Sequence, residues 1–177
     1  MLLLITALLA GPALANEDGT EIHVQAAALR ADGARQLAAS ARLVGEKDAY
    51  LGVEARVDPR HCWMGRVGLG FDVLGGGKWD LKLGLFLGGT GNGLERDGGF
   101  ITGTEVALGA EIGRLYGQYR WLGGIGGSDL AQLHSENDLT VGFRVIDELR
   151  VYGQVIRARG GSFDERRAMG LGVAWRF

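Results

Sequence analysis

The chain has 177 residues, of which 32 are glycine, two are proline and one is cysteine, and its formal net charge is −2 at pH 7. This length suits one domain, and a charge so close to zero excludes a broadly basic surface for nucleic acid. Glycine without proline, spread through alternating segments, excludes collagen-like and proline-rich structure and favours closely packed, curved strands.

The N-terminus has the features of a secretory signal peptide. Residues 2–10 form a short apolar run, a Gly-Pro pair ends it, and residues 13–15 read Ala-Leu-Ala. Small residues in this A-x-A arrangement are typical of a cleavage site, so we expect a signal peptide over 1–15 and one mature domain over 16–177. A membrane anchor is not favoured, because the run is shorter than the roughly 20 residues of a membrane-spanning helix. The signal peptide is atypical in one respect, since no Lys or Arg precedes the apolar run.

The rest of the chain is organised as segments in which apolar residues alternate with small or polar ones, the period-two pattern of a β-strand. Gly-, Asp- or Asn-containing breaks separate them. We expect strands near 20–30, 35–44, 49–57, 64–74, 78–88, 100–112, 114–123, 138–146, 149–158 and 166–177. The alanine-rich stretch 26–43 could instead be a helix, which would leave eight strands beside a small N-terminal helix.

The breaks between the segments alternate in length. Every second break is short, at 45–48, 75–77, Gly113 and 147–148, whereas longer breaks lie at 58–63, 90–99, 124–137 and 159–165. Short periplasmic turns and long outer loops are the pattern of outer-membrane barrels. The first break, 32–34, is short and departs from it.

The two faces of each segment differ in chemistry. One face is apolar, as in Leu81, Leu83, Leu85 and Leu87, and the other carries charge. A soluble sandwich would turn the apolar face inward, whereas a membrane barrel turns it towards lipid, and periodicity alone does not decide between them. For a barrel, the side chains predicted to line the lumen are Glu54, Arg56, Arg66, Asp72, Asp80, Lys82, Glu105, Glu111, Arg120, Arg144, Arg150 and Arg176.

Aromatic and basic residues gather near predicted strand ends. Aromatic girdles at both membrane interfaces are typical of such barrels, although ordinary core aromatics would give a similar pattern. The interface candidates are Trp63, Trp79, Trp121, Trp175 and Phe177. The basic residues at the outer ends of the last two strands are Arg157, Arg159, Arg166 and Arg167. They could pair with lipopolysaccharide phosphates, or form a solvated loop cluster.

The last strand carries a family resemblance. Gly172, Trp175 and the terminal Phe177 follow the order of glycine, two variable residues, an aromatic, any residue and a final aromatic. This ending resembles the C-terminal insertion signal of bacterial outer-membrane β-barrels, with Gly170 where that family usually has a polar residue. The resemblance implies a location in the outer membrane and recognition of this strand by the barrel-assembly machinery.

The order of features also resembles the small YfaZ-type outer-membrane proteins, within the broader group of OmpX- and OmpW-like barrels. The segments Leu115-Tyr-Gly-Gln-Tyr119 and Leu149-Arg-Val-Tyr152 carry this likeness. That group has no firmly assigned activity, so the resemblance implies a fold and a location rather than a mechanism.

Two hypotheses concern the inward charges. They could pair as a polar network that fills the interior, because unpaired buried charge is costly. Alternatively, eight basic residues (Arg42 among them) against five acidic ones would line a narrow aqueous path with mild anion preference.

Catalytic and metal sites are poorly supported by the sequence. The adjacent trio His134-Ser135-Glu136 falls in the longest predicted loop, and nucleophilic catalysis requires the base to reach the hydroxyl, which adjacent loop residues seldom achieve. The histidines His23, His61 and His134 are scattered, so we expect no metal and no cofactor. The single Cys62 forms no internal disulfide and is interpreted as an inert loop cysteine, with an intermolecular bridge or a metal ligand as alternatives.

These observations predict an all-β protein, a closed antiparallel up-and-down transmembrane barrel of ten strands that is a monomer. The expected role is structural or interactive at the cell surface. A narrow channel for small solutes is the alternative, and a soluble periplasmic binder or an outer-membrane lipid hydrolase are further alternatives.

Overall fold

The protein is described by a computed structural model that covers residues 21–31, 34–45, 49–57, 62–74, 78–92, 97–127, 132–160 and 163–177. The expected signal peptide over 1–15 lies outside the described residues. Within them, no helix has the length and apolarity needed to cross a bilayer.

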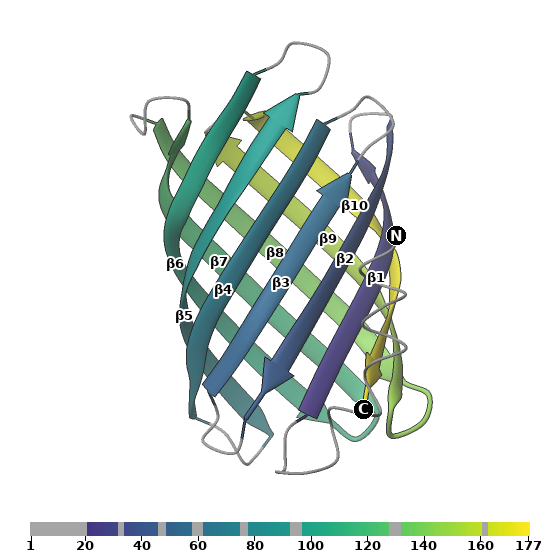
Figure 1. Ribbon diagram of the computed structural model, residues 1–177. Coiled ribbons are helices and arrows are strands. Elements are labelled where there is room, and N and C mark those ends of the chain that lie inside the picture. The colour runs from purple at the N-terminus through teal and green to yellow at the C-terminus, as the bar shows by residue number, and fades with distance from the viewer. Residues whose placement is uncertain are drawn as a thin grey trace.

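The described residues form ten strands that follow one another around a closed ring (Figure 1). Every neighbouring pair is antiparallel. The strands are β1 (Glu21–Ala31), β2 (Ala34–Val44), β3 (Ala49–Val57), β4 (Cys62–Leu74), β5 (Trp79–Asn92), β6 (Asp97–Ile112), β7 (Leu115–Gly127), β8 (Gln132–Arg144), β9 (Leu149–Gly160) and β10 (Phe163–Arg176). The predicted ten-stranded closed barrel is therefore confirmed. The helical alternative for the alanine-rich stretch is wrong, because it forms β1 and β2.

The ring closes where β1 pairs with β10. Nine residue pairs connect the two strands, from His23 opposite Arg176 to Ala31 opposite Ala168. Beyond this ladder, the amide of Phe177 donates to the carbonyl of Ile22 at 2.9 Å. We call the end of the barrel that contains Glu21 and Phe177 the lower end and the opposite end the upper end, as they stand in Figure 1.

Several strands extend further at the upper end than the sequence pattern predicted. β5 continues to Asn92 and β7 to Gly127, and β8 already begins at Gln132. The connections at both ends consequently span two to four residues, and the predicted long outer loops are wrong. Cys62 likewise begins β4 rather than lying in a loop, and its side chain is not among those described. The long breaks came from polar and glycine-rich stretches that lie within strands.

The barrel turns its apolar side chains outward. Among the described residues, 34 large hydrophobic side chains are exposed, whereas 14 hydrophobic residues are buried. Leu85, Val141 and Leu171 are 59%, 57% and 75% exposed, while Arg56 and Arg66 on the same sheet are 6% and 5% exposed. This arrangement is the inverse of a water-soluble β-sandwich, in which the apolar faces meet inside.

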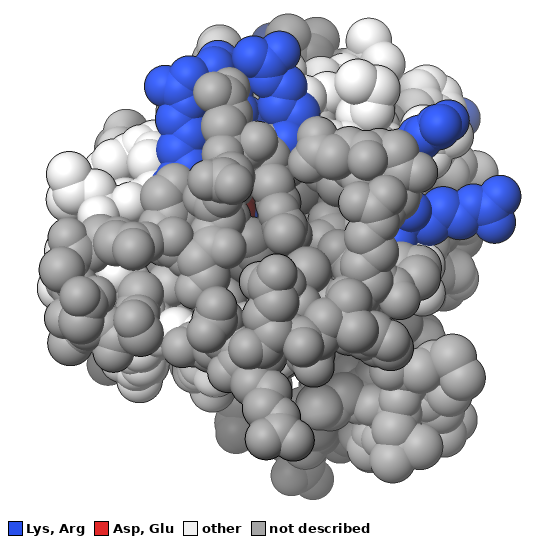
Figure 2. All heavy atoms as spheres, turned by 90° about the horizontal axis from the view of Figure 1, so that it is seen from above, with Lys and Arg blue, Asp and Glu red and all other residues white. Residues whose placement is uncertain are grey.

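The described charged side chains at the upper rim of the barrel are positive. Seen from above, lysine and arginine atoms gather in two places along the rim, and almost no aspartate or glutamate atom is visible (Figure 2). The described carboxylates lie inside the barrel or near its lower end.

Interior tyrosines fit against glycines of neighbouring strands. Tyr50 of β3 lies against Gly70 of β4 and Gly84 of β5, so that a Cβ atom at either glycine would meet the tyrosine hydroxyl. Tyr152 of β9 lies in the same way against Gly172 of β10. The absence of a side chain at these positions lets a large ring lie flat along the inner wall.

This packing predicts different tolerances at two glycines. The substitution Gly84→Ala places a methyl group against Tyr50 and 2.8 Å from the carbonyl oxygen of Leu69, whereas a Cβ at Gly65 meets nothing within 4 Å. We expect Gly84→Ala to lower the free energy of unfolding by roughly 1–3 kcal/mol, as overpacking does, and Gly65→Ala to leave it nearly unchanged. Urea unfolding of the folded barrel in detergent micelles measures both, and equal stabilities for the two variants would contradict the packing described here.

Candidate functional site

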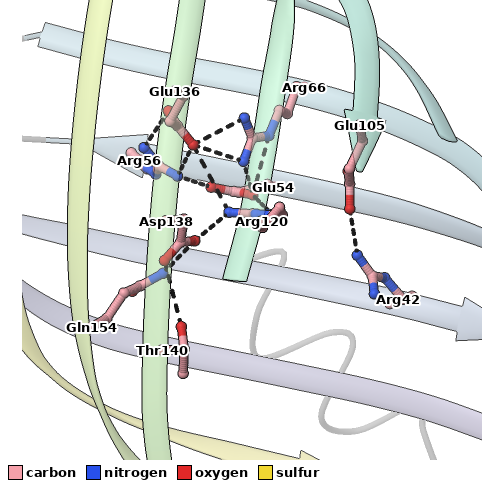
Figure 3. A network of polar contacts seen from close by, with 10 residues as sticks. All are labelled: Arg42, Glu54, Arg56, Arg66, Glu105, Arg120, Glu136, Asp138, Thr140 and Gln154. Atoms are coloured by element: carbon pink, nitrogen blue, oxygen red, sulfur yellow. Dashed lines mark hydrogen bonds and ion pairs between the residues drawn. The ribbon is translucent and has the colours of Figure 1, made fainter. Parts of the chain in front are cut away.

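Six charged side chains meet inside the barrel and are called the central cluster here. Glu54 and Arg56 come from β3, Arg66 from β4, Arg120 from β7, and Glu136 and Asp138 from β8 (Figure 3). Each strand supplies its charges from the inward side of its alternation, because its outward positions are apolar or small. The cluster holds three arginines and three carboxylates, so its formal charge is zero.

The ion pair of Arg56 and Glu136 spans the lumen. The two guanidinium nitrogens Nη1 and Nη2 donate to Oε2 and Oε1 of Glu136 at 2.8 and 2.7 Å. This fork-to-carboxylate geometry is the strongest form of ion pair that side chains make. β3 and β8 lie five strands apart in either direction around the ring, so this contact joins opposite walls.

Glu54 is shared by three arginines. Its carboxylate accepts from Nε of Arg66 at 3.1 Å and from Nη1 of Arg120 at 2.9 Å, and it lies 2.6 Å from Nη2 of Arg56. Arg66 also donates to Glu136 at 3.3 Å. Each carboxylate therefore offsets more than one guanidinium, as a buried network requires.

Asp138 completes the cluster on the side of β8 and β9. Its Oδ2 accepts from Nη2 of Arg120 at 2.7 Å and from the side-chain amide of Gln154 at 2.8 Å. The Thr140 hydroxyl reaches Oδ1 at 3.4 Å. Hydrogen bonds from Thr140 and Gln154 thus satisfy lone pairs of the Asp138 carboxylate that no arginine contacts.

A second bridge crosses the lumen beside the central cluster. Nη2 of Arg42 on β2 donates to Oε1 of Glu105 on β6 at 3.1 Å, and the guanidinium lies 4.3 Å from the ring centroid of Tyr50. The remaining cavity here has a volume of about 80 Å³, which suffices for a few water molecules.

Smaller ion pairs occupy the lower end. Lys82 lies 3.6 Å from Asp72 and 3.4 Å from Asp80. Glu111 accepts from Arg150 at 2.8 Å and lies 3.3 Å from Arg144. These side chains are more exposed than the central cluster, so solvent weakens their attraction.

Apolar side chains pack around the ionic layer. Met64, Phe86, Ile101 and Leu122 form one buried cluster on β4 to β7. A second cluster on β1, β9 and β10 includes Ala27, Leu29, Tyr152, Ile156 and Ala168. The interior is therefore filled by side chains both at the level of the central cluster and beside it.

The structure brings most of the predicted inward residues together. Glu54, Arg56, Arg66 and Arg120 meet in the central cluster. The other predicted lumen residues, apart from Arg176, make the ion pairs described above, namely Asp72, Asp80, Lys82, Glu105, Glu111, Arg144 and Arg150. Arg176 does not join them, because it is exposed at the lower end of β10.

Sequence reasoning missed Glu136 and Asp138. Both were assigned to a loop or its margin, because Ser135 and Asn137 interrupt the apolar outward pattern of β8. The signal was present, since Leu133 and Leu139 keep the outward register and are 80% and 49% exposed. Extending that alternation backwards from Leu139 puts both carboxylates inside.

The two added carboxylates change the charge balance of the interior. Seven basic and seven acidic inward side chains are now described, namely Arg42, Arg56, Arg66, Lys82, Arg120, Arg144 and Arg150 against Glu54, Asp72, Asp80, Glu105, Glu111, Glu136 and Asp138. The excess of positive charge, on which the expected anion preference depended, is not found among the described residues.

Four of the five aromatic candidates lie towards the ends of the barrel, and the fifth, Trp121, lies near its middle. Trp63 begins the upper part of β4, and Trp79 and Trp175 lie at the lower end, where the rings of Trp175 and Phe177 are 6.1 Å apart. Trp121 lies within β7 rather than at its end, because this strand continues to Gly127. Their role at a membrane interface stays a prediction.

The catalytic trio considered from sequence lies on β8 and not in a loop. His134 and Glu136 are 2% and 1% exposed inside the barrel, whereas Ser135 is on the opposite face of the strand, so the histidine and the hydroxyl do not converge. Among the side chains that the structure describes, no group of three or more His, Cys, Asp or Glu is placed to hold a metal ion.

The fold is shared with solved membrane porins. The chain is similar to the KdgM porin in complex with disordered oligogalacturonate, at 8% identity and a TM-score of 0.54, over 88% of this chain and 99% of that one. It is also similar to the NanC porin, at 9% identity and a TM-score of 0.54, over 87% of this chain and 98% of that one. No family model matches the chain, and no curated protein matches it. At these identities the likeness concerns the fold alone, a closed antiparallel barrel.

The central cluster generates a prediction about stability. Replacing Glu136 by Gln removes one of the two carboxylates that Arg56 and Arg66 share and leaves Glu54 to offset both guanidiniums, and breaking a buried ion pair in this way costs roughly 3–5 kcal/mol. We expect the urea midpoint of the barrel in detergent to fall accordingly. Glu148→Gln, at an exposed position of the lower end, is the control and should change stability by less than about 0.5 kcal/mol. A Glu136→Gln barrel as stable as the unaltered protein would refute the role of this pair.

Proposed function

We propose that the protein is a monomeric bacterial outer-membrane barrel whose lumen is closed by side chains, with a structural or cell-surface interaction role. The observation that carries this proposal is the bidentate pair of Arg56 and Glu136, which joins opposite walls of the barrel at 2.7 and 2.8 Å. A pair that crosses the lumen at this level supports the proposal, because it occupies space through which water or a solute would have to pass.

The outer surface supports a membrane location. Monomeric soluble proteins rarely expose contiguous apolar patches larger than a few hundred Å², whereas here apolar side chains cover the outward positions of most strands. All strand edges are paired, as a chain in hydrocarbon requires. The C-terminal sequence, which resembles the insertion signal of outer-membrane barrels, supports recognition by the barrel-assembly machinery through β10.

The energetics of the interior support closure. Opening a path past the central cluster would separate carboxylates and guanidiniums that are held within hydrogen-bonding distance, and a charge left buried and unpaired costs several kcal/mol. The apolar clusters beside it would also lose contacts. Thermal motion alone therefore populates an open state rarely.

A narrow channel is the second candidate. The solved structures that share this fold include two named as porins, and a cavity of about 80 Å³ remains beside the bridge of Arg42 and Glu105. In this case the central cluster would have to rearrange to admit a solute. The balanced charge of the described interior favours neither anions nor cations.

Conductance in a planar lipid bilayer separates the two candidates. We expect the unaltered barrel to be silent, and a variant in which all six central-cluster residues are replaced by Ser to show stepwise currents, because the polar layer that blocks the lumen has gone. The control replaces the lower-end pair of Glu111 and Arg150 by Ser and should stay silent. Stable open steps from the unaltered barrel would reject the closed-lumen proposal in favour of a channel.

A gel-shift measurement confirms that each variant is folded before the currents are interpreted. A folded membrane barrel migrates differently with and without boiling, and it is extracted from the outer membrane only by detergent. If the six-residue variant fails this test, the smaller variant Arg56→Ser/Glu136→Ser replaces it. A mature chain that is soluble without detergent would contradict the membrane location itself.

A further inference from the structure

Arginines that face outward line up across four neighbouring strands at the upper end. Arg30 of β1, Arg35 of β2, Arg157 of β9 and Arg167 of β10 are all exposed. Their outward direction follows from their neighbours, because Leu29, Ile156 and Ala168 are buried inside the barrel at the alternate positions. We call these four residues the arginine patch.

The strand register places like charges directly opposite one another. Arg30 is the cross-strand partner of Arg35, and Arg157 is the cross-strand partner of Arg167. Arg30 is also opposite Met169 of β10, which puts Arg167 on the diagonal from it. Like charges in directly opposed positions repel one another, so the register concentrates positive charge on this part of the outer surface.

The surface below the patch is apolar. Towards the middle of the barrel, the next outward residues include Leu37, Val155 and Met169, which are 68%, 50% and 63% exposed. A molecule that covers this surface therefore meets hydrocarbon-like side chains first and guanidinium groups at the rim. A phospholipid or glycolipid with phosphate in its headgroup matches this arrangement, with acyl chains against the apolar side chains and phosphate against the guanidinium groups.

We propose that the arginine patch binds the phosphate groups of lipopolysaccharide in the outer leaflet. The guanidinium fork suits phosphate oxygens bidentately, and an anion between each opposed pair removes the repulsion between its arginines. This inference rests on the proposed membrane location, with the upper end facing the cell exterior. Sequence reasoning pointed to β9 and β10 alone and missed Arg30 and Arg35; the side chain of Arg166 is not among those described.

Charge complementarity selects this occupant over a second copy of the chain. Among the described side chains, no carboxylate lies on the outward face of the upper end, so these side chains of a neighbouring barrel in the same orientation offer the patch no opposite charge. Arg157 and Arg167 have polar or electrostatic partners of their own, and the proposal depends on the position and sign of the patch rather than on unpaired groups.

Lipid binding to the folded barrel tests the proposal. The probes are lipid A carrying two phosphates, the same lipid without phosphate, and inorganic phosphate, with binding followed by native mass spectrometry of the full mature chain released from detergent. We expect the phosphorylated lipid to bind about tenfold or more tightly than the dephosphorylated one, as charge-assisted bonds to phosphate imply. Equal binding of the two lipids would overturn the proposal.

Paired substitutions locate the site. Arg30→Gln/Arg35→Gln and Arg157→Gln/Arg167→Gln should each weaken binding of the phosphorylated lipid by about tenfold, while the matched lower-end control Lys78→Gln/Arg114→Gln should leave it unchanged. Unchanged binding in both patch variants, or displacement of the lipid by inorganic phosphate at similar concentrations, would also overturn it. The gel shift and the need for detergent report on the proposed function separately, so a failure there is distinguished from a failure of lipid recognition.

Discussion

The pairing of β1 with β10 is the contact on which the rest of the structure depends. Once it forms, every strand has two neighbours, no edge remains, and the sheet has an inside and an outside. Closure then determines which of the two alternating sets of side chains in each strand faces outward and which faces the lumen. Apolar residues at one set of positions cover the outer wall, and the charged residues between them are enclosed in the lumen.

Enclosure explains why the charges are so thoroughly paired. The guanidinium and carboxylate groups of the central cluster are largely buried, so each needs a partner of opposite sign. Arg56 and Glu136 find that partner on the opposite wall, and Glu54 serves three arginines at once. The resulting contacts hold distant strands at a fixed separation, whereas backbone hydrogen bonds connect only neighbours. We infer that the cluster helps to set the cross-section of the barrel.

Much of the fold could be predicted from sequence because a strand with two unlike faces leaves a strong pattern. The ten strands followed from that alternation, whereas the closed barrel was expected from the signal peptide, the C-terminal resemblance and the alternating lengths of the breaks. The upper ends of β5 to β8 could not be predicted, because their outward positions include Gly, Thr, Ser and Asn rather than large apolar residues, and a polar outward residue looks like a loop. For the same reason Glu136 and Asp138 were missed, and the interior was assigned an excess of positive charge. Which carboxylate would meet which arginine depends on contacts between strands five positions apart, and no local pattern encodes those.

On the outer surface, too, the sequence pattern shows only part of the arginine patch, and the pairing of strands shows the rest. Sequence alone identified arginines near the ends of the last two strands, but only the closure of β10 on β1 makes them continuous with Arg30 and Arg35. A seam that joins the two ends of the chain can thus create a surface feature to which distant parts of the sequence contribute equally.

The proposed membrane location requires the apolar face of the barrel to lie outward in lipid. The four tryptophans of the chain, Trp63, Trp79, Trp121 and Trp175, all lie on that face and are 46%, 62%, 37% and 37% exposed. Tryptophan fluorescence of the unaltered protein in vesicles, quenched either by brominated lipid or by iodide in the buffer, tests the claim most directly. For a barrel in lipid we expect strong quenching by brominated lipid and weak quenching by iodide. Strong quenching by iodide with none by brominated lipid would contradict it.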